Sequence, residues 1–130
     1  MGLFTVDEAR AELARLLPVL EEIVRLRAEH AELSASVKGG ADTLLGGLPE
    51  LKGATARLDE LLTQVQATGA ELKGIAPLLL DFPGELDGTD VLLCWLEGDR
   101  ALSWYHRADL GFAGRRRLPG PGDSPAGLPW

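Results

Sequence analysis

Residues 44–72 carry a hydrophobic repeat that alternates spacings of four and three residues. This alternation keeps the repeat positions on one side of an α-helix and is typical of a helix that packs along a partner helix. A similar repeat, interrupted by Arg27, runs through the N-terminal segment. We therefore predict two long helices joined by a glycine-rich turn into an antiparallel hairpin, over about residues 5–73. The repeat positions are Leu13, Leu17, Leu20, Val24 and Ala31 in the first segment and Leu44, Leu48, Leu51, Thr55, Leu58, Leu62, Val65, Gly69 and Leu72 in the second.

Local signals predict where these helices begin and end. Thr5 and Glu8 have the spacing of a capping box, in which each side chain accepts a hydrogen bond from the other's backbone N–H, so the first helix should begin near Thr5. Gly39-Gly40 should end it, because glycine adopts the left-handed conformation that closes a helix. Pro49 suits a first helical turn, which places the start of the second helix near Leu48.

A proline interrupts the first repeat. Pro18 lacks the N–H that would bond the carbonyl of Ala14, and its ring clashes there, so we expect a kink or break near Leu16. Gly69 and Gly74 should loosen the end of the second helix, which we expect to close with Glu71 and Lys73.

After Gly74 the pattern changes to short runs typical of β-strands, at residues 76–82, 90–96 and 101–106. Asp87-Gly88 predicts a turn between the first two runs, and Gly98-Asp99 predicts a two-residue type II′ turn between the last two. The predicted fold class is α+β: a long kinked helical hairpin with a small three-stranded antiparallel sheet at its end.

The predicted domain covers residues 1–117, in which the sheet and a glycine-rich turn occupy about 76–117. Residues 118–130 are rich in proline and glycine and are expected to be disordered, with Trp130 as a candidate docking anchor.

The charge and cysteine content exclude several classes of protein. A net charge of −7 argues against a general nucleic-acid binder or a binder of anionic membranes, because both need a basic surface. A single cysteine excludes an intramolecular disulfide and a multi-cysteine zinc site, and it fits the reducing cytoplasm. No apolar run approaches the roughly 18 residues of a membrane span.

Further apolar residues lie beside the repeat on both helices. They could pack on the C-terminal region or on a second copy of the chain, and they lead us to expect a homodimer formed through the helical surface. These residues are Leu16, Ile23, Leu26 and Leu33 on the first helix and Leu45 and Leu61 on the second.

Residues 81–115 hold the chain's rarest side chains, including its only cysteine and its only tyrosine. Aromatic side chains bring large buried areas, and cysteine and histidine bring reactive atoms, so this segment is where a site would be expected. The rare side chains are Phe82, Cys94, Trp95, Trp104, Tyr105, His106 and Phe112.

Several short motifs occur in order along the chain. They are Asp81-Phe82-Pro83, Leu93-Cys94-Trp95, Trp104 with His106, and Gly111-Phe112-Ala113-Gly114-Arg115, preceded by Phe4-Thr5-Val6-Asp7-Glu8-Ala9 and Leu17-Pro18 near the N-terminus. Together these motifs resemble an uncharacterised prokaryotic family, domain of unknown function 2203. The resemblance implies a bacterial protein without supplying an activity.

The length of the turn at Gly98-Asp99 decides which side chains share a face. A two-residue turn places Trp95, Trp104 and His106 on one face and Cys94 on the other, because side chains alternate along a strand. This register removes a Cys/His metal pair, and we predict no metal site. A loop of odd length would restore the pair.

His106 has two interpretations. As a structural group it is buried and bonded to Asp81, Asp109 or a backbone carbonyl. As a functional group it transfers a proton or holds a ligand beside Asp81, with Arg115 binding an anion. The candidate ligand-binding residues are Asp81, Trp104, His106 and Arg115.

The sequence contains no Ser/His/Asp order, phosphate-binding loop or paired-carboxylate motif that identifies catalytic residues, and no cofactor motif. We therefore expect a non-enzymatic interaction or assembly module that binds protein and neither nucleic acid nor membrane. The alternative is a small-ligand or metal-dependent protein or enzyme with a site near His106, Asp81 and Arg115.

Overall fold

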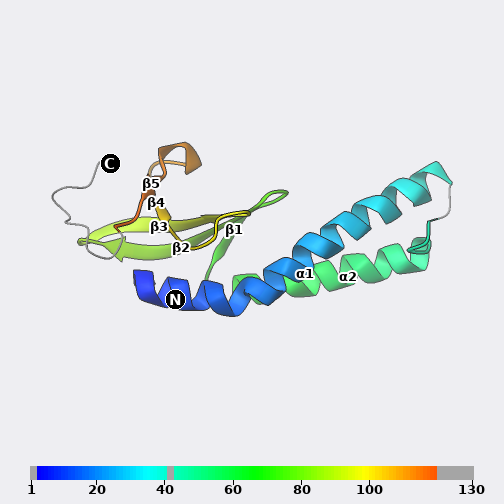
Figure 1. Ribbon diagram of the computed structural model, residues 1–130, viewed down its shortest axis with the longest axis horizontal. Helices are drawn as coiled ribbons and strands as arrows, with labels where there is room; N and C mark the ends of the chain where they lie inside the picture. The colour runs from blue at the N-terminus through cyan, green and yellow to red at the C-terminus, as the bar shows by residue number, and fades with distance from the viewer. Residues whose placement is uncertain (1–2, 41–42, 120–130) are drawn as a thin grey trace. The chain divides into compact units, whose positions relative to one another are not determined.

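Two helices come first in the chain and an antiparallel sheet follows. The computed structural model describes residues 3–40 and 43–119 (Figure 1). Helix α1 spans Val6–Gly39 and helix α2 spans Leu48–Ala67. This order of elements confirms the predicted α+β class. No helix among the described residues is long and apolar enough to cross a membrane.

The chain divides into two compact units, one formed by residues 15–67 and the other by the described residues before and after them. In the helical unit, the Arg57 guanidinium on α2 donates to both carboxylate oxygens of Glu22 on α1, each at 2.9 Å. His30 Nε2 lies 3.0 Å from Thr55 Oγ1. These contacts join α1 and α2 side by side (Figure 1), which confirms the helical hairpin.

Three of the predicted helix ends are confirmed: both ends of the first helix and the start of the second. Thr5 N donates to Glu8 Oε1 at 2.9 Å and Glu8 N donates to Thr5 Oγ1 at 3.0 Å, which is the capping box. Helix α1 ends at Gly39, and the following Gly40 has a φ of 69° in the left-handed region. Helix α2 begins at Leu48, as Pro49 predicts.

The break expected near Leu16 is not found, because α1 continues through Pro18. Both Pro18 and Ala14, whose carbonyl loses its helical partner, are exposed. Water can therefore take the place of the missing N–H, which lets an otherwise favourable helix continue.

The residues that α1 and α2 bury differ from the predicted repeat. Leu13, Leu20 and Val65 are buried as expected, whereas Leu17 is exposed and Leu44 is fully exposed. The apolar residues beside the repeat are largely the buried ones. They are Leu16, Ile23, Leu26, Leu33 and Leu61, together with Ala9 and Ala54.

Among the described residues the sheet contains five strands, so the prediction of three was wrong. Their spatial order is the same as their order in the chain, and every neighbouring pair is antiparallel. The strands are β1 (Glu71–Ile75), β2 (Leu78–Leu86), β3 (Thr89–Leu96), β4 (Trp104–Arg107) and β5 (Arg116–Arg117), with a short 3-10 helix, η1 (Phe112–Gly114), between the last two.

Strand β1 occupies residues that the helical repeat had assigned to the second helix. Helix α2 ends at Ala67, and Gly69 takes a φ of 96°, which a helix interior does not accept. The chain then pairs with β2, and Leu72 lies opposite Leu80. The backbone of β1 thus forms hydrogen bonds with β2 instead of continuing α2 by another turn.

The connection between β3 and β4 also differs from the prediction. A turn does form, since Asp99 N donates to Leu96 O at 2.8 Å and Leu96 N donates to Asp99 Oδ2 at 2.9 Å. The Trp95 indole N–H then donates to the Asp99 carbonyl at 3.0 Å, so this turn folds back on β3 instead of starting β4. Pairing resumes only at Trp104, which lies opposite Cys94, and the loop of residues 97–103 has an odd length.

The register between β3 and β4 therefore differs by one residue from the predicted one, and this shift changes which side chains share a face of the sheet. The apolar face carries buried large side chains. Phe4, just before α1, packs its ring edge-on against Phe82 of this face, with a centroid distance of 5.4 Å. The apolar face consists of Leu80, Phe82, Val91, Leu93, Trp95 and Tyr105.

The opposite face, which we call the polar face, carries Asp81, Cys94, Trp104 and His106. The prediction that Trp95 and Trp104 share a buried face was wrong, because Trp95 is buried on the apolar face and Trp104 is half-buried on the polar face.

The structured part of the chain reaches into the expected tail. Leu118 is buried, and its N–H donates to the Ser103 carbonyl at 2.7 Å. Residues 120–130, and with them Trp130, lie outside the described residues.

Candidate functional site

Three ionisable side chains are buried in the middle of the polar face. Asp81 on β2 is 3% exposed, Cys94 on β3 is fully buried, and His106 on β4 is 5% exposed. Asp81 lies directly opposite Cys94. His106 lies opposite Leu92, which is two residues before Cys94 on β3, so His106 and Cys94 are on the same face. One carboxylate oxygen, the sulfur and one ring nitrogen all lie within 4.8 Å of one another.

The two ring nitrogens of His106 have different partners. Nδ1 lies 2.7 Å from the Leu110 carbonyl and 3.0 Å from the Arg107 carbonyl. A carbonyl oxygen can only accept, so Nδ1 carries the proton. Nε2 faces the carboxylate of Asp81, at 3.2 Å from Oδ2.

Asp81 uses only part of its hydrogen-bonding capacity. Its Oδ2 contacts His106, but its Oδ1 is buried and has no hydrogen-bond partner among the described residues. A buried carboxylate oxygen without a partner costs free energy, since water has been removed and nothing replaces it. The cluster therefore contains an acceptor that is not satisfied within the described chain.

Cys94 interacts with both Asp81 and Arg115. Burial raises the pKa of the Cys94 thiol to about 11, with a further contribution from the Asp81 carboxylate, while the Arg115 guanidinium acts in the opposite direction. Arg115 donates to Asp99 Oδ2 at 3.2 Å and stacks over the Trp104 ring at 4.4 Å from its centroid. An ion pair with Asp99 thus holds the guanidinium in place.

The structure brings the four sequence-predicted candidates into one region of the sheet. Asp81 contacts His106 directly, and Trp104 and Arg115 stack on each other beside Cys94. His106 is buried and bonded internally, as its structural interpretation requires.

A cavity of about 300 Å³ lies against the buried cluster. Asp81 and His106 form part of its wall, so the cluster borders this hollow despite its burial. Lys73 and Asp109 bring charges of both signs. The Glu71 carboxylate, 3.0 Å away, raises the pKa of Lys73, and Asp81 adds to this effect. Leu79, Leu92, Ala108, Leu110 and Gly111 complete the lining.

The segment after β4 forms much of this wall. His106 holds it through the Leu110 carbonyl, and Gly114 N donates to the Gly111 carbonyl at 2.9 Å within the turn that includes η1. The Gly111–Arg115 motif thus reverses the chain and returns Arg115 to the polar face, where it stacks over Trp104.

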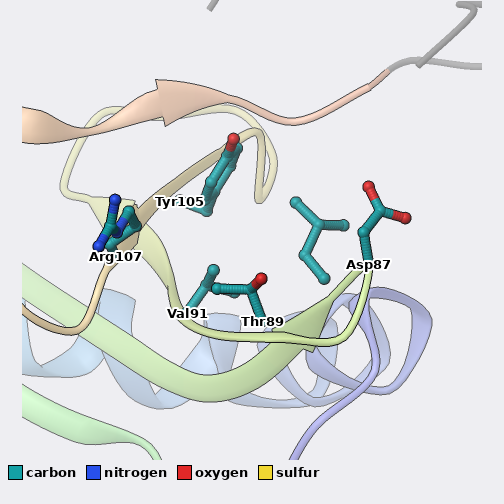
Figure 2. Close-up of a pocket in the computed structure, with 6 residues that line it drawn as sticks. Asp87, Thr89, Val91, Tyr105 and Arg107 are labelled. Atoms are coloured by element: carbon teal, nitrogen blue, oxygen red, sulfur yellow. The ribbon is translucent and has the colours of Figure 1, made fainter. Parts of the chain in front are cut away.

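A second hollow of about 460 Å³ lies near the turn between β2 and β3. Figure 2 shows Val91 and Tyr105 on one side of it and Asp87 and Thr89 near the turn. Its charged groups are exposed, and Arg107 is already paired with Asp109 at 2.9 Å. Nothing in this arrangement indicates a ligand.

Sequence reasoning missed two members of the site. Cys94 was placed on the other face, because a two-residue turn was assumed where the loop is longer. Lys73 was assigned to a helix end. Gly69 was the signal for a strand at Lys73, since a glycine after a helical run favours a helix end over a repeat position.

A family model described as "Uncharacterized conserved protein (DUF2203)" matches residues 2–118. The chain belongs to the DUF2203 family. The match covers both helices, all five strands and the buried cluster of this DUF2203 protein. No curated protein and no solved structure matches it.

Proposed function

We propose that this DUF2203 protein binds a small polar molecule in the cavity beside Asp81 and His106. The observation that carries the proposal is the burial of Asp81, Cys94 and His106 together on one face of the sheet, with two of them lining the cavity.

Stability alone does not account for this cluster. Replacing both partners of a buried polar contact by apolar side chains of the same shape can be nearly neutral or stabilising, so a sheet that needed only a core would not require Asp81 and His106 here. Buried ionisable groups that border a cavity are instead typical of binding and catalytic sites.

The size and the lining of the cavity limit the ligand. About 300 Å³ is at the lower end of the range for small-molecule sites. Leu79, Leu92 and Leu110 supply an apolar wall, while Lys73 and Asp109 supply charges at the cavity. A compact molecule with polar groups fits this combination.

A fragment screen followed by amide NMR tests the proposal. We expect compounds that bind to shift the amide signals of Leu79, Ala108 and Gly111. Ala108→Trp should abolish these shifts, because Ala108 is exposed and lines the cavity without belonging to the buried cluster.

Ala35→Trp, at an exposed position of α1, is the matched control and should leave the shifts unchanged. The proposal is contradicted if no compound shifts the cavity signals, or if the same shifts persist in Ala108→Trp.

The second candidate function is assembly with another copy of the chain. Three apolar residues near the loop between the helices support it: Val37 is 38% exposed, Leu48 is 50% exposed and Leu44 is fully exposed. The residues first expected to form a dimer surface do not support it, because Ile23 and Leu61, for example, are buried. The cytoplasm, which the single cysteine suggests, remains the predicted compartment.

Light scattering at a protein concentration of about 10 µM, a scale typical of moderate affinities, tests this candidate. A dimer that Leu44→Asp converts to a monomer would support it, with Ala35→Asp as the control. A monomeric wild-type protein would contradict it.

A further inference from the structure

We infer that Asp81, Cys94 and His106 form a binding site for a single divalent transition-metal ion of the zinc class. This inference deepens the proposed function, because the ion would lie at the wall of the proposed ligand cavity. It stands on the geometry of three buried donor atoms, one from each of three neighbouring strands.

The hydrogen bonds of His106 leave a donor atom directed at Asp81. With the proton on Nδ1, a neutral imidazole presents the lone pair of Nε2 to Asp81 Oδ2 at 3.2 Å. Two acceptors at this distance repel each other unless a proton or a cation lies between them. The Leu110 carbonyl thus fixes the tautomer and the ring orientation of His106, as a carbonyl bonded to the other ring nitrogen does for a metal-binding histidine.

The buried charge of Asp81 favours an ion over a shared proton, because Oδ1 has no hydrogen-bond partner among the described residues that would stabilise this charge. A cation bound by the carboxylate compensates the charge of the whole group, and it also gives the sulfur of Cys94 a role in the cluster. A single ion would thus be held by all three side chains, whereas the shared proton joins only Asp81 and His106.

The distances suit a tetrahedral ion. Bonds of about 2.0–2.1 Å to nitrogen and oxygen place those two atoms about 3.3 Å apart in a tetrahedron, close to the observed 3.2 Å. The widest separation in the cluster, at most 4.8 Å, would close by about 1 Å to satisfy a metal–sulfur bond of about 2.3 Å.

The donor types select the class of ion. One thiolate, one imidazole and one carboxylate suit Zn²⁺ and similar borderline ions, whereas Ca²⁺ and Mg²⁺ need several oxygen ligands. Binding would release the thiol proton of Cys94 to solvent, and one thiolate and one carboxylate would then balance the two charges of the ion. The fourth position would face the cavity, because Asp81 and His106 line it.

Cobalt spectroscopy on the metal-free full chain tests the inference. We expect one Co²⁺ per chain, tetrahedral visible bands, a near-ultraviolet thiolate-to-cobalt charge-transfer band, and displacement by Zn²⁺. Cys94→Ser should abolish the charge-transfer band and weaken Co²⁺ binding by more than about tenfold. Even the loss of a group that only orients a metal ligand typically costs at least that much. Glu85→Gln removes an exposed carboxylate of β2 that lies outside both the cluster and the cavity, so it is the matched control and should bind like wild type.

The inference is overturned if the wild-type protein gives no charge-transfer band or if Cys94→Ser keeps the wild-type spectrum. The wild-type spectrum decides the question even if a variant fails to fold. Ala108→Trp separates this inference from the proposed function, because it should lose the ligand shifts and retain the cobalt spectrum.

Discussion

Gly84 is the position in the sheet that most closely limits side-chain size. The N-terminal segment meets β2 there, where Phe4 N donates to the Pro83 carbonyl at 2.7 Å and Phe4 forms a bridge with Gly84. A Cβ on Gly84 would lie 2.8 Å from the Phe4 carbonyl oxygen and 3.0 Å from a methyl carbon of Leu93. Only glycine allows this close approach.

Gly84→Ala should therefore lower the free energy of unfolding by about 1–3 kcal/mol, the usual cost of overpacking. Gly53→Ala is the matched control, because Gly53 lies inside α2 with no atom within 4 Å of its added Cβ. It should raise the stability by about 0.5–1 kcal/mol, since alanine favours a helix. Urea denaturation measures both changes, and equal effects would contradict the close approach at Gly84.

At the scale of elements, the register between β3 and β4 sets the chemistry of the sheet. Cys94 and His106 reach the same face because the loop of residues 97–103 has an odd length. With an even loop, the alternation of side chains would separate the two.

The two tryptophans test this register. Trp95→Ala should destabilise the protein by about 3–5 kcal/mol, the typical cost of removing a large core aromatic. Trp104→Ala should cost clearly less, because Trp104 is half-buried on the polar face. Chemical denaturation compares the two variants, and equal losses would favour the two-residue turn.

The pairing of α1 with α2 contains a pH-dependent contact. The hydrogen bonds from Arg57 hold the pKa of Glu22 below its usual value. A carboxyl group whose pKa is lowered by folding stabilises the fold above its unfolded pKa, and this contribution is lost as the pH falls through the folded pKa.

The difference in melting temperature between wild type and Glu22→Gln should thus be constant near neutral pH and shrink below about pH 4, near the ordinary pKa of glutamate. Thermal melts monitored by circular dichroism across this range measure it. Glu21→Gln is a neighbouring control outside the Arg57 ion pair, and a pH-independent Glu22→Gln difference would contradict the account.

The sequence predicted local features well and non-local ones less well. The capping box at Thr5 and the turn at Asp87-Gly88, where both residues have positive φ, depend on neighbouring residues and are confirmed. The β3–β4 register depends on Asp99, whose carbonyl accepts the Trp95 indole N–H. Turn propensity alone does not reveal that contact.

The helical repeat was ambiguous for a related reason. Leu13 and Leu20 belong equally to a stripe through Leu17 and to one through Leu16, because both alternate four and three residues. Burial selects the stripe through Leu16. The candidate residues Asp81, His106 and Arg115 could be predicted from their chemistry. The position of Cys94 beside them could not, because it depends on the register between β3 and β4.

Across the whole molecule, the two faces of the sheet bury different kinds of side chain. The apolar face forms the core through residues such as Phe82 and Leu93, both fully buried. The polar face buries Asp81, Cys94 and His106 next to a cavity. We propose that the helices and the apolar face stabilise the fold and that the polar face binds an ion and a ligand.

Anomalous X-ray diffraction at the zinc edge, from crystals of the full chain grown with Zn²⁺, tests this claim most directly. The account predicts one strong anomalous peak per chain, about 2.0–2.3 Å from His106 Nε2, Cys94 Sγ and an Asp81 carboxylate oxygen. An empty cluster with Nε2 still bonded directly to Asp81, or zinc bound only at surface carboxylates, would contradict it.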